Sequence, residues 1–592
     1  MMGTIGPMTS LLLLLQHFAS IPSCSAFVPS LSESTRPAVP RPLSASTCHT
    51  AHQSSWSAAD WSAALRTQPL VAPIAIVDTI GTLPLTFPAG ILYKAGPARF
   101  ENEGSGTREG TPYAHWLEGD GAISRLQLNP EAGPGEPAAT FAFRFVETDL
   151  QLSEREEGKI LARGTFGTNK DEGRNAFDFK LKNPCNTNAA AVGDTLLALS
   201  EVGLPHRLDP DTLAPQGVET FGGRLVDGAP AATLGPVLGA ALDPALGFGD
   251  AVCAHLHEMD GRHAFVAMRQ NAITSATCLR LLELDSKSGD IVSETESVLE
   301  NTGFPPHDWA ITPSYAAFVA TPAGGDLTPF LLGSKGPAEC ISFQRDVEAI
   351  VHIVPRANCK VEAMSVPLPA ALHPVHFANA WEAKGNAGEG DVPALEIFAT
   401  CWDDATVRRM GTTGESLLGS WAKVSGGDFG GVPTQRLMRI STGKEPAVEE
   451  AVPGLGHVDY VKCHPRYTGR RSRYVWGSIA AAAGNEPAPL APPQSFCRLD
   501  LHTKQKVDEW FAGERRFVDD FVLIEKDTET DAGSNNTPED QAWLVAPVFD
   551  AETNTSSFVV LDGQNLSAGP IFEVRLSSHI PWGLHGTYTR IK

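Results

Sequence analysis

Apolar residues along this chain come in short runs that turn-forming residues interrupt. Four such runs cover 140–146, 195–199, 542–548 and 557–561, and Gly, Pro, Asn and Asp separate runs of this kind. The first alternates apolar with small or polar residues, as a half-buried strand does, and the other three are typical of buried strands. Helical periodicity is weak almost everywhere. The pattern therefore predicts many short strands and few long helices.

The length of the strand-rich region narrows the architecture. The predicted strands extend from about residue 57 to the end of the 592-residue chain. One all-β fold reaches this size by radial repetition, as in a β-propeller. No clean internal repeat is visible, so the pattern alone leaves the number of blades open. Polar or Pro/Gly-rich stretches are predicted to be surface loops rather than domain linkers, at 102–111, 128–138, 384–391, 481–493 and 526–539.

Charge and cysteine spacing exclude two classes of protein. The chain contains 46 Lys and Arg and 69 Asp and Glu, which gives a formal net charge of −23. Because phosphate binding needs a basic surface, we expect no nucleic-acid partner. The ten Cys are scattered singly without a CxxC pair, so neither a zinc ribbon nor a small disulfide scaffold is indicated.

The first 56 residues have the composition of a targeting sequence. Residues 1–26 contain a short apolar core followed by small residues, as in a signal peptide. Residues 27–56 are rich in Ser, Thr, Pro and His and resemble a plastid transit peptide. We therefore predict a bipartite plastid presequence before a single domain over 57–592. Secretion is the alternative, because N-glycosylation sequons occur at Asn535, Asn554 and Asn565.

Four of the 17 His lie in distinctive local sequences. A single His is usually a core or surface residue, so the neighbouring residues carry the argument. The four are His255 in Cys-Ala-His-Leu-His, His307 in Pro-His-Asp-Trp-Ala-Ile-Thr, His376 in Val-His-Phe-Ala-Asn-Ala-Trp-Glu and His585 in Pro-Trp-Gly-Leu-His-Gly-Thr-Tyr. Further distinctive blocks precede them in order, at 88–97, 115–121, 186–188 and 196–210.

These blocks, in this order, resemble those of the carotenoid cleavage oxygenase family. The resemblance extends from about residue 80 to the C-terminus. It implies a seven-bladed β-propeller with a dome of helices and loops over the metal face. It also implies that His255, His307, His376 and His585 bind one Fe²⁺, with O₂ as co-substrate; imidazole nitrogen suits iron. His257, two residues after His255, is the alternative for the first ligand.

The family places three glutamates where they orient metal-binding histidines, a role that fixes the imidazole tautomer. Glu201 matches the first by its Leu-Ala-Leu-Ser-Glu context. Asp459 and Asp519 stand at the other two positions, with Asp520 as an alternative register for Asp519. Each Asp is one methylene shorter, so either the backbone moves inward, a water intervenes, or the iron is held less well. Thr187 matches a family threonine beside an open coordination position.

The implied reaction is dioxygenation of one conjugated C=C bond to give two carbonyl compounds. Stilbene-cleaving relatives have Lys just before the matching Glu, whereas this chain has Ser200. We therefore expect a carotenoid or apocarotenoid as substrate. Such a substrate enters from a membrane, and the apolar segment 229–249 is our predicted lipid contact. The alternatives are a retinoid-type isomerohydrolase, a non-catalytic apocarotenoid-binding propeller and an unrelated secreted β-protein.

Overall fold

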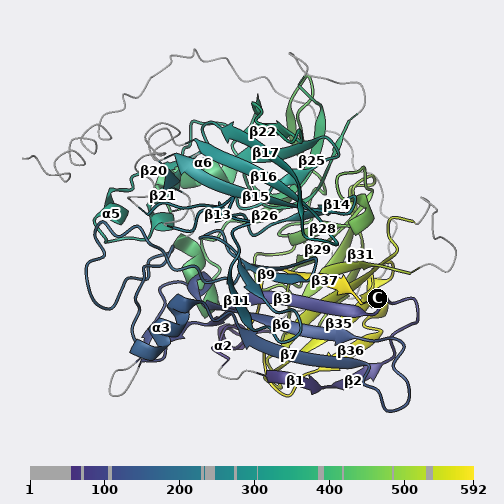
Figure 1. The fold of residues 1–592 in the computed structure, drawn as a ribbon. Coiled ribbons are helices and arrows are strands. Elements are labelled where there is room, and N and C mark those ends of the chain that lie inside the picture. The colour runs from purple at the N-terminus through teal and green to yellow at the C-terminus, as the bar shows by residue number, and fades with distance from the viewer. Residues whose placement is uncertain are drawn as a thin grey trace, which may run out of the picture. The chain divides into compact units, whose positions relative to one another are not determined.

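The predicted short strands form seven sheets of four to six strands, arranged as a seven-bladed β-propeller (Figure 1). The computed structural model describes residues 55–68, 72–104, 110–228, 232–233, 247–271, 276–302, 305–383, 392–416, 419–482, 486–527 and 538–591. Nearly all of the predicted presequence, and most of segment 229–249, lie outside these residues. The described residues belong to one unit, Thr50–Lys592. The predicted all-β propeller is confirmed.

The first three blades follow one another along the chain. Blade 1 contains β8 (Asn188–Val192), β9 (Thr195–Leu199), β10 (His206–Leu208) and β11 (Pro215–Val218). Blade 2 contains β12 (Ala232–Thr233), β13 (Ala251–Val252), β14 (His257–Met259), β15 (Arg262–Asn271), β16 (Thr277–Asp285) and β17 (Ile291–Leu299). Blade 3 contains β18 (Ala310–Ile311), β19 (Tyr315–Ala320), β22 (Ile350–Pro355) and β23 (Met364–Pro367).

The next two blades repeat the same four-stranded antiparallel order. Blade 4 contains β24 (His373–Glu382), β25 (Leu395–Trp402), β26 (Gln435–Ser441) and β27 (Ala447–Glu450). Blade 5 contains β28 (Asp459–Cys463), β29 (Tyr474–Ile479), β30 (Ser495–Asp500) and β31 (Gln505–Phe511). In blades 4 and 5 the first strand lies at one edge of the sheet, and β18, β24 and β28 are neighbours in the ring.

The last two blades join the two ends of the chain. Blade 6 contains β32 (Arg516–Val518), β33 (Val522–Glu525), β34 (Ala542–Asp550), β35 (Thr555–Asp562), β36 (Phe572–Arg575) and β2 (Asp78–Gly81). Blade 7 contains β1 (Ala72–Ile76), β3 (Gly90–Arg99), β6 (Asp120–Leu128), β7 (Ala139–Phe145) and β37 (Gly586–Arg590). Because β37 pairs with β3 and β2 pairs with β36, strands from both ends of the chain close the ring (Figure 1).

Helices and short strands fill the long connections at one end of the blades. They are α3 (Asp149–Glu157), α5 (Thr328–Leu331), α6 (Asp404–Thr413), η1 (Trp116–Glu118), η2 (Pro337–Cys340), η4 (Gly419–Gly426), β4 (Glu101–Asn102), β5 (Thr111–Pro112), β20 (Ala323–Gly325) and β21 (Ile341–Phe343). Neighbouring strands are antiparallel, so the segments that follow β19 and β25 leave the blades where β18 and β24 begin. These elements are the predicted dome.

A buried arginine joins several segments of the dome by hydrogen bonds. Arg163 has 1% of its surface exposed, and its guanidinium donates hydrogen bonds to four carbonyl oxygens, those of Asn175, Asp178, Phe330 and Lys335. Guanidinium presents five N–H donors in a fixed plane, which suits this convergence of backbone acceptors. Arg163 therefore fixes α5 against the segment that leads to β8.

Apolar side chains fill the space between neighbouring blades. The largest such cluster surrounds α2 (Ala58–Ala63), where Trp61 packs edge-on against Phe517 at 5.3 Å and Trp582 at 5.4 Å between ring centroids. A capping box between Ser57 and Asp60 begins this helix. Each fully buried aromatic or aliphatic side chain contributes about 1.5–3 kcal/mol. The remaining short helices, η5 (Pro465–Tyr467) and η6 (Leu566–Ala568), lie in connections of blades 5 and 6.

Candidate metal centre

The four predicted histidines converge on one point. One nitrogen from each of His255, His307, His376 and His585 lies within 4.8 Å of the other three. His255 Nε2 and His307 Nε2 are 3.2 Å apart, and the rings of His255 and His585 are 4.3 Å apart between centroids. Residues separated by up to 330 positions (585 − 255) in sequence therefore share one site.

The propeller explains this convergence. His255 lies between β13 and β14, His307 lies three residues before β18, His376 is on β24 and His585 immediately precedes β37. All four stand near the beginning of innermost strands, in blades 2, 3, 4 and 7. Since the innermost strands of a propeller surround its central channel, side chains at these positions point to the same place.

Three of the histidines contact a carboxylate through Nδ1. Glu201 Oε1 lies 2.9 Å from His307 Nδ1, and Asp459 Oδ1 lies 2.6 Å from His376 Nδ1. For His585 the contact is Asp520 Oδ2, at 3.0 Å. An Nδ1–H that donates to a carboxylate leaves the Nε2 lone pair free to bind a metal.

The carboxylate that contacts His585 belongs to Asp520 and not to the predicted Asp519. We predicted Asp519, but its side chain turns away from His585, accepting hydrogen bonds from the backbone N–H of Gly583 at 2.7 Å and of Asp520 at 2.6 Å. Asp520, the alternative register, contacts the histidine. The reason is local: the Asp519 carboxylate caps the backbone that leads to His585, and the next residue points to the opposite side.

A backbone irregularity brings the shortened Asp459 to its histidine. The pairing of β28 with β29 shifts register between Asp459 and Lys462, as at a β-bulge. Within it Tyr460 has a φ of 51°, a left-handed conformation that is costly for a residue with a bulky side chain. The ring of Tyr460 stacks on His376 at 5.1 Å between centroids. Because Asp459 reaches His376 directly, at 2.6 Å, no water intervenes between the shorter side chain and the imidazole.

His255 differs from the other three. Its nearest carboxylate oxygen is Asp308 Oδ2, 3.7 Å from Nδ1, beyond hydrogen-bond length. His257, the alternative ligand, instead places Nε2 2.7 Å from the carbonyl oxygen of Trp309 and is not part of the cluster. The Trp309 indole N–H donates back to the carbonyl of His255 at 3.0 Å, which fixes this segment.

The electrostatics of the cluster suit a cation. Burial, together with the neighbouring imidazoles, holds the pKa of His255 and of His585 well below the ordinary value, so both rings are neutral and can donate a lone pair. Burial favours a raised pKa for Glu201 and Asp459, but contact with His307 and His376 outweighs it and lowers both. His376 Nε2 is buried without a hydrogen-bond partner among the described residues.

This donor set fits a transition metal. Four converging imidazoles with an orphaned inward nitrogen are a poor arrangement without a cation, because the lone pairs face one another. Imidazole suits iron, copper, nickel and zinc rather than calcium or magnesium. Four ligands on an octahedral ion such as Fe²⁺ would leave two positions for other molecules.

The remaining predicted residue lies beside the cluster. Thr187 is buried, its Oγ1 is 3.5 Å from Glu201 Oε2, and its carbonyl accepts a hydrogen bond from the His585 N–H at 3.0 Å. Glu382, which ends the His376 block, accepts hydrogen bonds from the Thr312 hydroxyl and the Ser314 N–H, each at 2.9 Å. Its role is to join blades 3 and 4.

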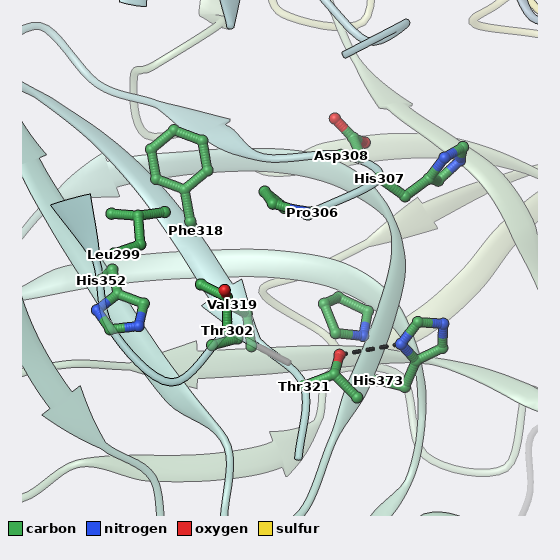
Figure 2. A pocket seen from close by; sticks show the side chains of 12 residues that line it. Leu299, Thr302, Pro306, His307, Asp308, Phe318, Val319, Thr321, His352 and His373 are labelled. Carbon is green, nitrogen blue, oxygen red and sulfur yellow. Dashed lines mark hydrogen bonds between the residues drawn. The ribbon is translucent and has the colours of Figure 1, made fainter. Parts of the chain in front are cut away.

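A small pocket lies against the backbone of the His307 segment (Figure 2). Leu299, Phe318, His352 and His373 are among its lining residues, and the Thr321 hydroxyl contacts His373 Nδ1 at 3.0 Å. In Figure 2 the His307 ring points away from this pocket. The space accommodates roughly one water molecule, so it is too small for a polyene.

Comparison with known proteins identifies the family. The family model described as retinal pigment epithelial membrane protein matches residues 66–590. An apocarotenoid-15,15'-oxygenase from Synechocystis is 30% identical over 548 residues, covering 91% of this chain and 98% of that protein. The chain belongs to the carotenoid cleavage oxygenase family. The predicted family and class of enzyme, a carotenoid cleavage dioxygenase, are thus confirmed.

Further relatives agree in fold and extent. A carotenoid cleavage dioxygenase 7 from rice (Oryza sativa), described as chloroplastic, is 25% identical over 86% of this chain and 87% of its own length. The cobalt-substituted Synechocystis apocarotenoid oxygenase has a TM-score of 0.72 at 26% identity, covering 91% of this chain and 100% of that one. The resemblance therefore includes every blade and not only the histidine blocks.

Proposed function

We propose that this enzyme is an iron(II)-dependent dioxygenase that cleaves one conjugated C=C bond of a carotenoid or apocarotenoid. The observation that carries this proposal is the convergence of four imidazoles, three of them in contact with a carboxylate. The named activities of the relatives, apocarotenoid oxygenase and carotenoid cleavage dioxygenase, give the substrate class.

The residues of this chain would hold the metal ion and orient the histidines that bind it. His255, His307, His376 and His585 would bind Fe²⁺, which supplies activation of O₂ when bound. Asp459 and Asp520 accept hydrogen bonds from Nδ1 of His376 and His585, and the Glu201 carboxylate lies 2.9 Å from Nδ1 of His307, so each carboxylate favours a proton on the Nδ1 that it contacts. Thr187 lies next to Glu201 and supports the backbone of the last ligand. The protein then determines the cleaved bond by where it holds the polyene.

Ser200 favours a carotenoid-type substrate over a phenolic stilbene. It directly precedes Glu201 and is buried, with 3% of its surface exposed. A hydroxyl provides no positive charge to hold a phenolate oxygen at this position. An apocarotenoid needs none, because its recognition rests on apolar contact along the chain of double bonds.

Product analysis tests the proposal. The iron-loaded protein is incubated under ¹⁸O₂ with a panel of carotenoids, apocarotenoids and resveratrol, and products are identified by mass. We expect two carbonyl fragments from a carotenoid or apocarotenoid, each carrying ¹⁸O, and none from resveratrol. Recovery of an intact isomerised polyene, or of substrate bound but unchanged, would contradict cleavage and favour an isomerohydrolase or a binding protein.

We also propose that the dome contacts a lipid surface through α5. Phe177, Leu327 and Leu332 are 51%, 48% and 59% exposed, and the Phe177 N–H donates to the carbonyl of Leu331, the last residue of α5. Exposed apolar groups of this kind mark membrane or protein contacts. The lipid contact that we predicted from the sequence, segment 229–249, lies mostly outside the described residues and stays a prediction. No described helix has the length and apolarity needed to cross a bilayer.

Vesicle flotation tests this surface. Replacing both Phe177 and Leu332 with Ser should lower partitioning to phosphatidylcholine vesicles by at least about tenfold, because each buried apolar side chain contributes about 1.5–3 kcal/mol. Leu85→Ser, at a leucine 79% exposed in the connection after β2, is the matched control and should bind as the wild type does. Equal partitioning of all three proteins would refute the assignment.

We further propose that residues 1–56 direct the enzyme to a plastid, on the composition of the two segments. In an alga with a secondary plastid, residues 1–56 fused to a fluorescent protein should enter the plastid, and residues 1–26 alone should deliver it only to the secretory pathway. Secretion of both fusions would support the alternative.

A further inference from the structure

A cluster of two lysines and two aspartates lies behind His585. We call Lys94, Lys462, Asp519 and Asp520 the lysine–aspartate cluster. Asp520 is fully buried, and Lys94 and Asp519 are each 3% exposed. Lys94 extends from β3 of blade 7 and Lys462 from β28 of blade 5, so the cluster joins the blades on either side of blade 6.

Both oxygens of the Asp520 carboxylate are engaged. Oδ2 faces His585 Nδ1 at 3.0 Å, with Lys94 Nζ at 3.9 Å, and Oδ1 accepts a short hydrogen bond from the Lys462 ammonium. Lys94 itself donates to two backbone carbonyl oxygens, those of Asp520 at 2.8 Å and of Leu584. Lys462 is thus the partner that holds the oxygen turned away from the histidine.

The other two carboxylates are held differently. Asp459 is fixed by its own backbone, because the bulge and the left-handed Tyr460 direct it, and the Tyr460 N–H donates to it at 2.8 Å. Glu201 keeps the longer side chain and has no ammonium group within ion-pair distance among the described residues. Asp520 alone combines a short side chain with a charged partner. A buried carboxylate without compensation is costly, so this partner matters.

We propose that Lys462 is a positioning residue of the metal centre, acting through Asp520 on His585. The ion pair compensates the charge of the buried carboxylate and fixes its rotation, which aims Oδ2 at the imidazole N–H. Loss of the ammonium would let the carboxylate turn toward Lys94, whose Nζ is 3.9 Å from Oδ2. His585 would then lose the acceptor that sets its tautomer. This inference rests on the proposed function only in requiring that the four histidines bind a metal.

Cobalt binding measures the effect without relying on turnover. The apo-protein is titrated with Co²⁺ as a spectroscopic probe, following the visible ligand-field bands and the dissociation constant. Removal of a partner that orients a metal ligand costs about 10–100-fold in metal affinity. We expect Lys462→Met to bind Co²⁺ at least about tenfold more weakly with altered bands, and Lys462→Arg to restore most of the affinity.

Lys506→Met is the matched control. Lys506 lies on β31 of the same blade, is 32% exposed compared with 31% for Lys462, and also pairs with a carboxylate, that of Glu509. The Lys506→Met variant should bind Co²⁺ with the same affinity and the same bands as the wild type. If Lys462→Met shows wild-type affinity and bands and only a lower unfolding midpoint, Lys462 is merely structural and the inference is wrong.

A double variant covers the case in which Lys462→Met does not fold. Asp520→Asn removes the buried negative charge, so adding Lys462→Met to it leaves no uncompensated carboxylate at this position. Because Lys462 acts through Asp520, the second substitution should not weaken Co²⁺ binding further. A further tenfold loss would overturn the proposed route. If the wild-type protein itself takes up no Co²⁺, the proposed metal function fails instead, which is a distinguishable result.

Discussion

Replacing His376 with alanine is expected to lower the rate of polyene cleavage by at least about 1,000-fold, or about 4 kcal/mol of activation free energy. His376 Nε2 is buried and has no hydrogen-bond partner among the residues that the structure describes, and its loss removes one of four candidate metal ligands. The substitution also leaves the largely buried Asp459 carboxylate without its imidazole. The measurement is cleavage rate together with iron content of the purified protein.

The control for this prediction is an exposed histidine. His502 lies in the turn between β30 and β31, outside the cluster, so His502→Ala should retain both iron and activity. Near-normal cleavage by His376→Ala would show that the reaction does not depend on the four-histidine site.

Lengthening Asp459 to glutamate is expected to reduce activity by roughly 10–100-fold, although the family has Glu at the matching position. The bulge and the left-handed Tyr460 already bring Oδ1 to 2.6 Å from His376 Nδ1. A further methylene adds about 1.5 Å of reach, which this arrangement has no room to absorb without moving the imidazole. Cleavage rate and iron affinity should fall together.

Two further variants separate the effect of side-chain length at Asp459 from the effect of its charge and from a nonspecific effect of Asp-to-Glu substitution. Asp459→Asn keeps the length but loses the charge, and should also lower iron affinity. Asp211→Glu, at a side chain that is 80% exposed, should change neither quantity. If Asp459→Glu matches or exceeds the wild type, the β-bulge does not fit the site to the shorter residue, and that part of our account is incorrect.

The sequence predicted the propeller and the four histidines because both depend on long, ordered resemblance. The blocks around His255, His307, His376 and His585 follow the family's order. The propeller brings these four histidines together regardless of the sequence between the blocks. Separating His255 from His257 needed only the preceding Ala254. Short apolar runs predicted strands, but their division into seven blades came from the resemblance.

Details set by backbone conformation could not be predicted in this way. Adjacent Asp519 and Asp520 point to opposite sides, and a sequence does not reveal which one faces a histidine. The left-handed Tyr460 has no sequence signal, since non-glycine residues rarely adopt this conformation. The pairing of Lys462 with Asp520 joins residues 58 positions apart on different blades. Each of these features depends on tertiary contacts within the propeller, which local sequence does not determine.

Metal analysis tests the central claim most directly. Protein produced with ample Fe²⁺, purified without oxygen and measured by mass spectrometry of its metals should contain close to one iron atom per chain, and the variant with alanine at both His307 and His585 should contain almost none. An active, folded wild-type enzyme without stoichiometric iron, or an unchanged iron content in the double variant, would contradict it.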